Sequence, residues 1–216
     1  MMRFLDFLFP PRSDERAMRD FSDDDFAALA LPYIVPETRP ETVALLPFNN
    51  PIVRSTLHEA KYHGNERAFR LLGSTLADFL PDYVADFEFY GHRKSIIVPV
   101  PLGKVRRKER GFNQAEEIAK YALKNLGSDF SIDVNLLERI KETQTQVSLE
   151  RKKREENMRG AFTASPRLRS ASRIELTNTL FIVLDDVVTT GATLQAASSA
   201  LRDAGALHIL PIALAH

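Results

Sequence analysis

The stretch LFIVLDDVVTTGAT, residues 180–193, decides which fold this chain adopts. Its apolar run is rich in β-branched residues and predicts a buried strand, which ends in two adjacent acids, Asp185 and Asp186. An ordinary buried strand has no need of paired carboxylates at its tip. The Val-Val-Thr-Thr-Gly loop that follows leads directly into a predicted helix, so its backbone N–H groups point outward at the positive end of that helix. Such an arrangement binds a phosphate.

The residues of this loop suit a phosphate that is attached to a sugar. Gly191 lets the main chain approach the anion closely, and Thr189, Thr190 and Thr193 offer hydroxyl donors. Carboxylates beside a phosphate repel it unless they face sugar hydroxyls or a divalent cation, and a sugar with a 5-phosphate satisfies both halves of the stretch. The alternative is a strand tip with two solvated aspartates and an ordinary capped turn. The motifs of P-loop NTPases (G-x-x-x-x-G-K-S/T) and of dinucleotide-binding folds (G-x-G-x-x-G) are absent from the sequence.

Strands and helices alternate along the rest of the chain. Strands are predicted over residues 95–102, 130–140, 178–186 and 207–215. Helices are predicted over residues 50–64, 66–80, 114–126 and 193–205, with a helical piece around 148–158. The second helix is expected to end before Pro81, and a basic loop is expected after the first strand. The order strand, helix, strand, strand, helix, strand predicts an α/β fold with an open, mainly parallel sheet.

The composition is that of an ordinary globular protein with one sizeable core, at 216 residues, 44% of them hydrophobic and 27% charged. The absence of cysteine excludes disulfides and thiolate metal sites, and the five histidines show no spacing typical of a metal site. The short FLDFLF run near the N-terminus indicates packing rather than a signal peptide. No run approaches the ~20 apolar residues that span a bilayer, so we expect a cytoplasmic protein without membrane insertion.

A net charge of zero conceals an uneven distribution of charge. Residues 91–173 hold 19 Lys and Arg against 10 Asp and Glu, and the rest of the chain holds 10 against 19. The runs KVRRKER (104–110) and RKKR (151–154) contribute much of the excess. Charge runs are usually solvated surface, but two such runs in one half favour an anionic partner, either polyphosphate or nucleic acid.

The stretch 180–193 resembles the phosphoribosyl-pyrophosphate (PRPP) binding motif of type I phosphoribosyltransferases. Three further segments resemble the ComF-like competence proteins within that class: VPVPLGKVRRKERGFNQA (98–115), QVSLERKKREENMRGAF (146–162) and EAKYHG (59–64). The similarity covers roughly residues 45–216, with the motifs in the family's order. It implies a phosphoribosyltransferase-like sheet flanked by helices, with a smaller N-terminal hood.

The resemblance also implies a division of the chain. Residues 91–216 are expected to form the phosphoribosyltransferase core and residues 45–90 a helical hood. Residues 1–44 occupy the position of a zinc ribbon whose first cysteines follow Phe-Pro-Pro-Arg in the family. Here Ser13 and Arg16 stand in the expected cysteine positions, so no zinc is expected.

Roles for individual residues follow from the resemblance. Asp185 and Asp186 are the expected catalytic residues, which bind the 2- and 3-hydroxyls of the PRPP ribose. The residues expected at the 5-phosphate are Val187, Val188, Thr189, Thr190, Gly191, Ala192 and Thr193. Those expected at the pyrophosphate are Arg106, Arg107, Arg110, Arg151 and Arg154. Mg²⁺ is expected to bridge substrate oxygens through water, with no direct protein ligand.

The acceptor that attacks C1 of the ribose is not indicated by the sequence. Tyr62, His63 and Phe112 can stack on a base or simply pack, and residues 141–159 fall where the wider superfamily carries a mobile lid, with a solvated helix face as the alternative. Three hypotheses stay open: a phosphoribosyltransferase that uses PRPP and Mg²⁺, a non-catalytic competence module that binds single-stranded DNA, and a PRPP-responsive regulator. The resemblance implies a competence helicase as a partner. The regulator lacks a recognisable helix-turn-helix.

Overall fold

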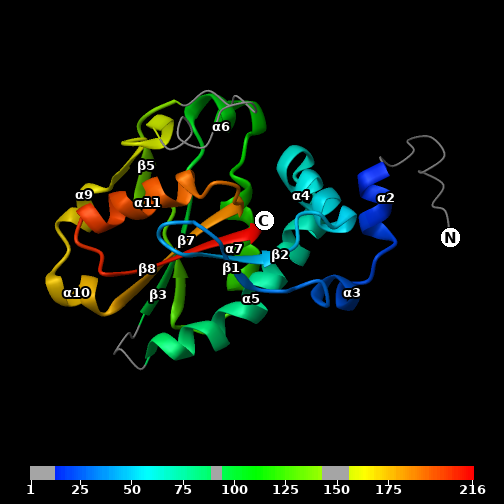
Figure 1. The fold of residues 1–216 in the computed structure, drawn as a ribbon, viewed down its shortest axis with the longest axis horizontal. Coiled ribbons are helices and arrows are strands. Elements are labelled where there is room, and N and C mark those ends of the chain that lie inside the picture. Colours follow the sequence, from blue (N-terminus) through cyan, green and yellow to red (C-terminus); the bar gives the residue numbers. More distant parts are fainter. Residues whose placement is uncertain (1–12, 89–93, 143–155) are drawn as a thin grey trace.

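A computed structural model describes residues 13–88, 94–142 and 156–216. Its centre is a six-stranded sheet in the order β1-β2-β8-β7-β3-β4 (Figure 1). The strands are β1 (Tyr33–Val35), β2 (Thr42–Leu46), β3 (Lys94–Pro99), β4 (Phe130–Ile132), β7 (Thr179–Val187) and β8 (His208–Ala215). All neighbouring strands are parallel except β1 and β2, which are antiparallel. The predicted open, mainly parallel α/β sheet is confirmed.

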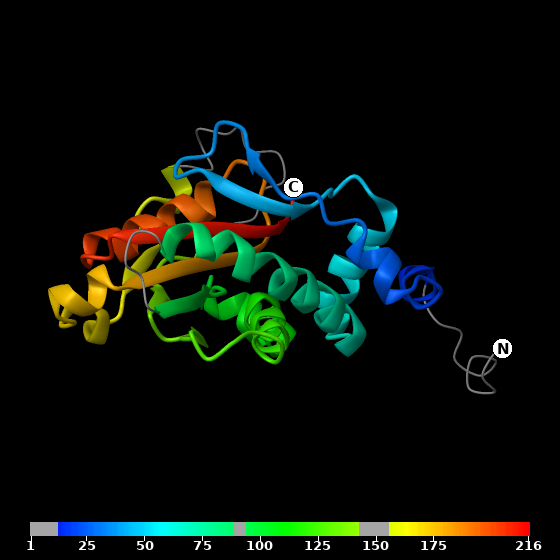
Figure 2. The same cartoon turned by 90° about the horizontal axis from the view of Figure 1, so that it is seen from below.

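Helices cover both faces of this sheet (Figure 2). On one face lie α5 (Glu66–Glu88) and α7 (Gln114–Leu123), and α4 (Pro51–His63) packs against α5 beyond the carboxyl ends of the strands (Figure 1). On the other lie α11 (Ala192–Asp203) and a second, two-stranded sheet of β5 (Leu137–Arg139) and β6 (Phe162–Ala164), against which α11 packs. The other helices in the described residues are short: α2 (Ser13–Arg19), α3 (Asp23–Ala27), α6 (Lys104–Arg110), α9 (Pro166–Arg169) and α10 (Arg173–Thr177).

The two-sided cover explains why β7 is apolar without interruption. Leu180, Ile182 and Leu184 join the core that includes α5 and α7, whereas Phe181 and Val183 join the core that includes α11. Successive side chains of a strand point to opposite faces, so a strand between two helical layers needs an apolar residue at every position. Full burial of each such side chain contributes roughly 1.5–3 kcal/mol to folding.

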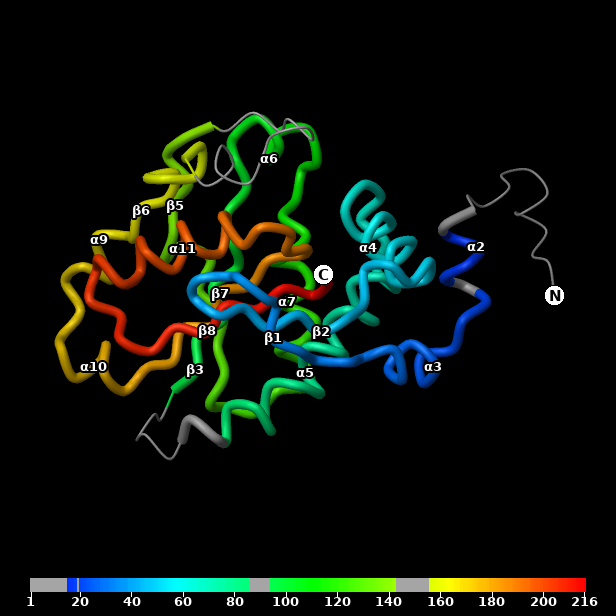
Figure 3. Tube along the Cα trace, viewed as in Figure 1, coloured from blue at the N-terminus to red at the C-terminus, as the bar shows by residue number. Residues whose placement is uncertain are grey.

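The N-terminal part of the chain is tied to the sheet and to the helical layer (Figure 3). Helix α2 packs against α4 and α3 packs against α5. The chain then adds β1 and β2 at the sheet edge beside β8. The Phe-Pro-Pro-Arg stretch at residues 9–12 lies outside the described residues, and no helix in the described part of the chain is long and apolar enough to cross a membrane.

Three details of the predicted elements were wrong. Helix α5 continues through Pro81 to Glu88, because Leu80 and Val84 are buried while the proline ring is exposed, so packing outweighs one lost backbone bond. The expected basic loop after β3 is the helix α6, which ends at Gly111 with φ 77°. The strand expected over 130–140 is two strands in different sheets. An Asx-type turn divides them, in which the Asn135 N–H donates to Asp133 Oδ1 at 2.9 Å.

Candidate functional site

Strand β7 carries Asp185 and Asp186 to the carboxyl edge of the sheet, where ligands collect in open α/β folds. β7 lies in the middle of the sheet, between β8 and β3. The pairing of β7 with β3 ends at Leu184, which lies opposite Pro99. Strand β7 then continues beside β8 alone, with Asp185 opposite Ala213. Both aspartates are partly exposed, whereas the five residues before them are buried. The carboxylates therefore begin where the packed part of the strand ends.

Asp186 is held by donors from three elements. Its Oδ2 accepts a hydrogen bond of 2.6 Å from Gln114 Nε2 on α7, and Lys61 Nζ on α4 lies 3.9 Å from the same oxygen. Its Oδ1 accepts from the Val187 N–H at 2.8 Å. Gln114 is itself bound by Arg110, whose guanidinium donates to Gln114 Oε1 at 2.7 Å. A chain of polar contacts thus runs from α6 through α7 to the end of β7.

The environment of Asp185 disfavours its charged form. Burial, followed by the neighbouring Asp186 carboxylate, raises the pKa of Asp185 to about 8. The Asp186 N–H, which donates to Asp185 Oδ1 at 2.9 Å, and the charge of Lys61 oppose this rise. Hydroxyl donors or a cation beside the pair would favour the ionised form. The site is therefore chemically suited to a ligand that supplies one or both.

The loop after β7 turns sharply into α11. Val188 is buried and its N–H donates to the Ala215 carbonyl at 2.9 Å, so it anchors the loop to β8. Gly191 has φ 77° and forms the N-cap of α11. A Cβ at this position would lie 2.8 Å from Cγ2 of the buried Thr38, so both backbone conformation and space require glycine. Thr189 is exposed and Thr190 half-buried at the surface of the turn.

Among the described residues, the arginines predicted to bind pyrophosphate lie in different surroundings, and only some of them are near the aspartate pair. Arg110 reaches the aspartate pair through Gln114, whereas Arg107 pairs with Glu116 at 3.1 Å. Arg106 is half-buried on α6. Arg151 and Arg154 lie outside the described residues.

Arg139 belongs to the site but was not identified from the sequence. It lies at the end of β5, with its guanidinium 5.5 Å from the ring centroid of Phe162. Burial and the charge of Arg106 lower the pKa of Arg139, while the charges of Glu142 and Asp185 raise it. Its charge therefore acts on the Asp185 side of the sheet edge. A lone arginine in a short polar strand gives no sequence signal, because its place depends on how the second sheet packs.

Glu142 occupies one backbone donor at the start of α6, just after the loop from β3. Its carboxylate accepts a hydrogen bond from the Lys104 N–H and lies against Gly103. Helix α6 also carries Arg106, Arg107 and Arg110, which were predicted to bind the pyrophosphate. A carboxylate oxygen of the chain itself is therefore bound where an anionic ligand was expected.

A cavity of about 610 Å³ opens beside the aspartate pair. Its lining comes from α4, from the end of β7 and from the residue Phe48 after β2, and includes His58, Lys61, Tyr62 and Asp186. Tyr62 is 55% exposed, with the guanidinium of Arg110 5.4 Å from its ring centroid. Phe112 packs edge-on against Phe69 at 5.7 Å instead, in line with the packing alternative. Of the two rings, Tyr62 is the one presented to the cavity.

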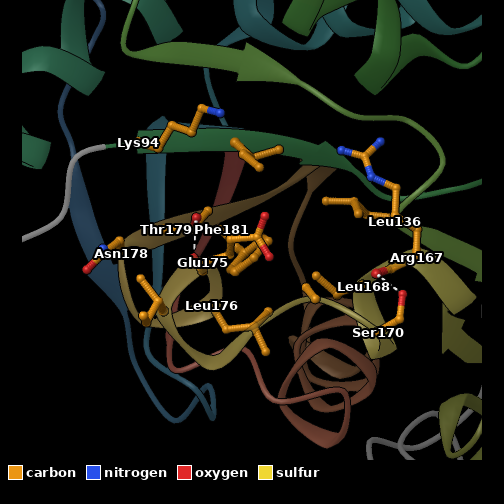
Figure 4. Close-up of a pocket in the computed structure, with 13 residues that line it drawn as sticks. Lys94, Leu136, Arg167, Leu168, Ser170, Glu175, Leu176, Asn178, Thr179 and Phe181 are labelled. Carbon is orange, nitrogen blue, oxygen red and sulfur yellow. Dashed lines mark hydrogen bonds between the residues drawn. The ribbon is translucent and has the colours of Figure 1, made fainter.

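A second cavity, of about 630 Å³, lies at the other edge of the sheet (Figure 4). Lys94 and Thr179, which begin β3 and β7, line it together with Phe181 and residues of α9 and α10. The strands are parallel, so this edge is opposite to the one that carries the aspartates. Its size alone does not make it the candidate site, since it lacks paired acids and the loop into α11.

Several proteins named for competence or for DNA utilization have sequences similar to this chain. Competence protein F of Haemophilus influenzae is 36% identical over 109 residues, which cover 50% of this chain and 44% of that protein. Competence protein ComFC of Bacillus subtilis is 28% identical over 157 residues, 72% of this chain and 56% of that protein. The DNA utilization protein YhgH of Salmonella typhi is 33% identical over 112 residues, 51% of this chain and 44% of that protein. The chain thus spans about half the length of these relatives, and no protein-family model matches it.

Proposed function

Because the chain belongs to the ComF family of competence proteins, we propose that it binds PRPP with Mg²⁺ at the carboxyl edge of its sheet and acts in natural competence. The observation that carries the proposal is the Asp185–Asp186 pair at the end of the central strand, followed at once by the Gly191 turn into α11. The names of the relatives, which refer to competence and to DNA utilization, support the biological role.

The aspartates would hold the ribose of PRPP. Two vicinal hydroxyls can each donate a hydrogen bond to one carboxylate, which would relieve the repulsion that raises the pKa of Asp185. Gln114 and Lys61 fix the orientation of Asp186 before a ligand arrives. A carboxylate held in this way loses little side-chain entropy on binding.

The turn into α11 would hold the 5-phosphate. The first N–H groups of a helix have no partner within the helix, and the Thr189 and Thr190 side chains lie at the surface of this turn. Val187 and Val188 use their own N–H groups on Asp186 and Ala215, so their part is to fix the loop. The phosphate contacts are assigned to residues 189–193.

The pyrophosphate would lie toward α6 and β5. Arg106 and Arg139 supply positive charge on this side, and the Lys104 N–H that Glu142 now occupies is a backbone donor for an anionic oxygen. Mg²⁺, when bound with the substrate, would neutralise pyrophosphate charge as it leaves C1. The carboxylates present fit a cation bound through water and substrate oxygens, the mode that Mg²⁺ prefers.

The cavity beside Asp186 is the place for an acceptor. In the proposed transfer the acceptor's nucleophilic atom forms a bond to C1 of the ribose while the bond from C1 to the pyrophosphate oxygen breaks, and pyrophosphate departs. The described residues that line the cavity would position the acceptor, with Tyr62 as a flat surface for a ring. Catalysis of this kind depends on positioning and on stabilising the departing charge.

Calorimetry tests the binding proposal directly. The wild-type protein should bind PRPP in the presence of Mg²⁺, and the combined variant Asp185→Asn, Asp186→Asn should bind at least about 100-fold more weakly, since two charge-assisted hydrogen bonds are lost. Asp203→Asn, an exposed change at the end of α11, is the matched control and should bind as the wild type does. Equal binding by the double variant would remove the aspartates from the site. Release of pyrophosphate from PRPP with a panel of bases and amines then tests transfer.

A second function, binding of single-stranded DNA without catalysis, is favoured by α6. Helix α6 buries no residue and exposes Lys104 and Lys108. Nucleic-acid binding through such a surface weakens steeply as salt rises. Lys108→Glu should lower the affinity for a labelled oligonucleotide in fluorescence anisotropy and leave PRPP binding intact, because Lys108 is exposed and has no part in the proposed PRPP site. Unchanged DNA affinity would show that the exposed surface of α6 does not bind DNA. It would also remove the proposed means by which the chain could bind the same DNA as a competence helicase.

A further inference from the structure

We infer that His58, Glu59 and His63, at the C-terminal end of α4, form a site for a divalent transition-metal ion such as Zn²⁺, Co²⁺ or Ni²⁺. The inference is independent of PRPP binding and concerns different residues. One ligand atom from each of the three side chains lies within 4.8 Å of the other two. Imidazole nitrogen and carboxylate oxygen are the donors that these ions favour.

The distances suit an ion after a small adjustment. Metal–ligand bonds of 2.0–2.2 Å place neighbouring donors of a tetrahedral site about 3.4 Å apart. The donors here, which lie within 4.8 Å of one another, must therefore close by at most about 1.4 Å. His58 and His63 are exposed, so their rings can turn about the side-chain bonds without disturbing the core.

The buried Glu59 gives the cluster a fixed point. Its side chain has no exposed surface, and Asn65 Nδ2 donates to its Oε2 at 3.1 Å. Its other oxygen, Oε1, lies 3.9 Å from Nε2 of His63. Asn65 is itself fixed, because its Oδ1 accepts from the N–H groups of Arg67 and Ala68 at 3.0 and 3.3 Å. A ligand oriented by a hydrogen-bonded neighbour is typical of metal sites, and such neighbours raise metal affinity.

The end of the helix brings the two histidines together. Positions five apart lie on different faces of a regular helix, yet the rings of His58 and His63 have centroids only 5.5 Å apart. Helix α4 stops at His63, and Gly64 turns the chain with φ 60°. The His63 side chain lies back over the preceding turn, toward Glu59. The spacing His-Glu-x-x-x-His matches no common zinc motif, so the sequence alone gave no signal.

The position places the ion at the wall of the proposed acceptor cavity. His58 lines the cavity of about 610 Å³, and Lys61 on the same turn of α4 lies 3.9 Å from Asp186. Three protein ligands leave one coordination position for water or for a donor atom of a bound molecule. The site assigned here is therefore an open one, suited to a nitrogen or oxygen donor that enters the cavity.

Metal titration of the untagged, metal-free protein without PRPP tests the inference. Co²⁺ should bind with one equivalent and give the visible absorption of a four- or five-coordinate nitrogen and oxygen site, and Zn²⁺ should displace it. His58→Ala and His63→Ala each remove one exposed ligand and should weaken binding at least tenfold. His208→Ala, which removes an imidazole at the start of β8, is the control and should bind normally.

Two outcomes separate this site from the aspartate pair. The variant Asp185→Asn, Asp186→Asn should keep its Co²⁺ spectrum even where it loses PRPP, because its aspartates are not ligands of this ion. Loss of Co²⁺ in that variant would assign the ion to the aspartates and overturn the inference. The absence of stoichiometric binding, or equal affinity in the wild type and His63→Ala, would overturn it as well, and would show that the rings only pack, as His58 does on Tyr62 with centroids 4.7 Å apart.

Discussion

Replacement of Asp185 by asparagine should stabilise the protein, and by an amount that depends on pH. The pKa of Asp185 is raised from 3.8 to about 8 by burial and by Asp186. A group with a raised pKa in the folded state binds more protons folded than unfolded, so its contribution to stability is complete below pH 3.8 and is lost as the pH rises toward 8. Asparagine never ionises, and Asp185→Asn therefore removes this loss.

The size of the effect follows from the pKa. One pKa unit corresponds to about 1.4 kcal/mol, so a rise of about four units corresponds to roughly 6 kcal/mol above pH 8. Asp185 keeps part of its surface in water, and solvent screening reduces that figure. The asparagine oxygen can still accept from the Asp186 N–H. We expect the variant to be more stable than the wild type by about 2 kcal/mol at pH 8, and by close to zero at pH 4.

Urea unfolding measured from pH 4 to 8 on both proteins provides the test, since changes in the midpoint report stability when the slope is constant. The difference between the two free energies of unfolding should grow steadily over this range. Asp203→Asn, which removes a carboxylate from an exposed position of α11, is the matched control. A flat difference for Asp185→Asn, or one that grows toward acid, would refute the assignment of a destabilising charge to Asp185.

Three further changes test other parts of the site. Gly191→Ala should lower the free energy of unfolding by about 2–3 kcal/mol, because the φ of 77° and the 2.8 Å approach to Thr38 Cγ2 both disfavour a side chain. Adding Thr38→Ser removes the Cγ2 methyl group of Thr38 and should restore part of the lost stability. Gln114→Leu should cost about 1–3 kcal/mol in urea unfolding, because Asp186 loses a donor at 2.6 Å. Glu142→Gln should strengthen binding of magnesium pyrophosphate several-fold in calorimetry, because a competing charge leaves the Lys104 N–H.

Each of these changes has a matched control in the chain. Gly127→Ala adds the same methyl group where nothing lies within 4 Å, and Gln195→Leu repeats the change of side chain at an exposed position of α11. Glu138→Gln removes a charge from an exposed position of β5. A control that changes as much as its partner would show that the effect is general rather than local to the site.

The central strands of the sheet could be predicted from the sequence because both of their faces are buried. β3, β7 and β8 lie between two helical layers, and burial on both faces produces the continuous apolar runs from which they were predicted. The errors occur where long-range packing decides. Helix α5 continues through Pro81 because the apolar residues on either side of the proline, Leu80 and Val84, are buried in the core. Strand β5 leaves the sheet of β4 because it pairs with β6, which follows much later in the chain.

Some residues of the candidate site could likewise be predicted from the sequence, and others could not. Asp185, Asp186 and Gly191 were identified because consecutive residues form a complete chemical pattern. Gln114, Lys61 and Arg139 come from three other elements, and their relation to β7 exists only once the helices and the second sheet have packed. Sequence order does not reveal it, since Gln114 lies 72 positions from Asp186.

The two aspartates differ in a way that bears on function. Asp186 receives a glutamine amide, a backbone N–H and a nearby lysine, all from the protein itself. Asp185 receives chiefly a backbone N–H, and its charge is disfavoured by burial and by its neighbour. A carboxylate that lowers the stability of the folded protein at neutral pH is unlike one that serves packing, for which asparagine or leucine would do better. Asp186 is the preorganised anchor of the pair, and Asp185 is the residue whose charge gains most when a hydroxyl group or a cation is bound.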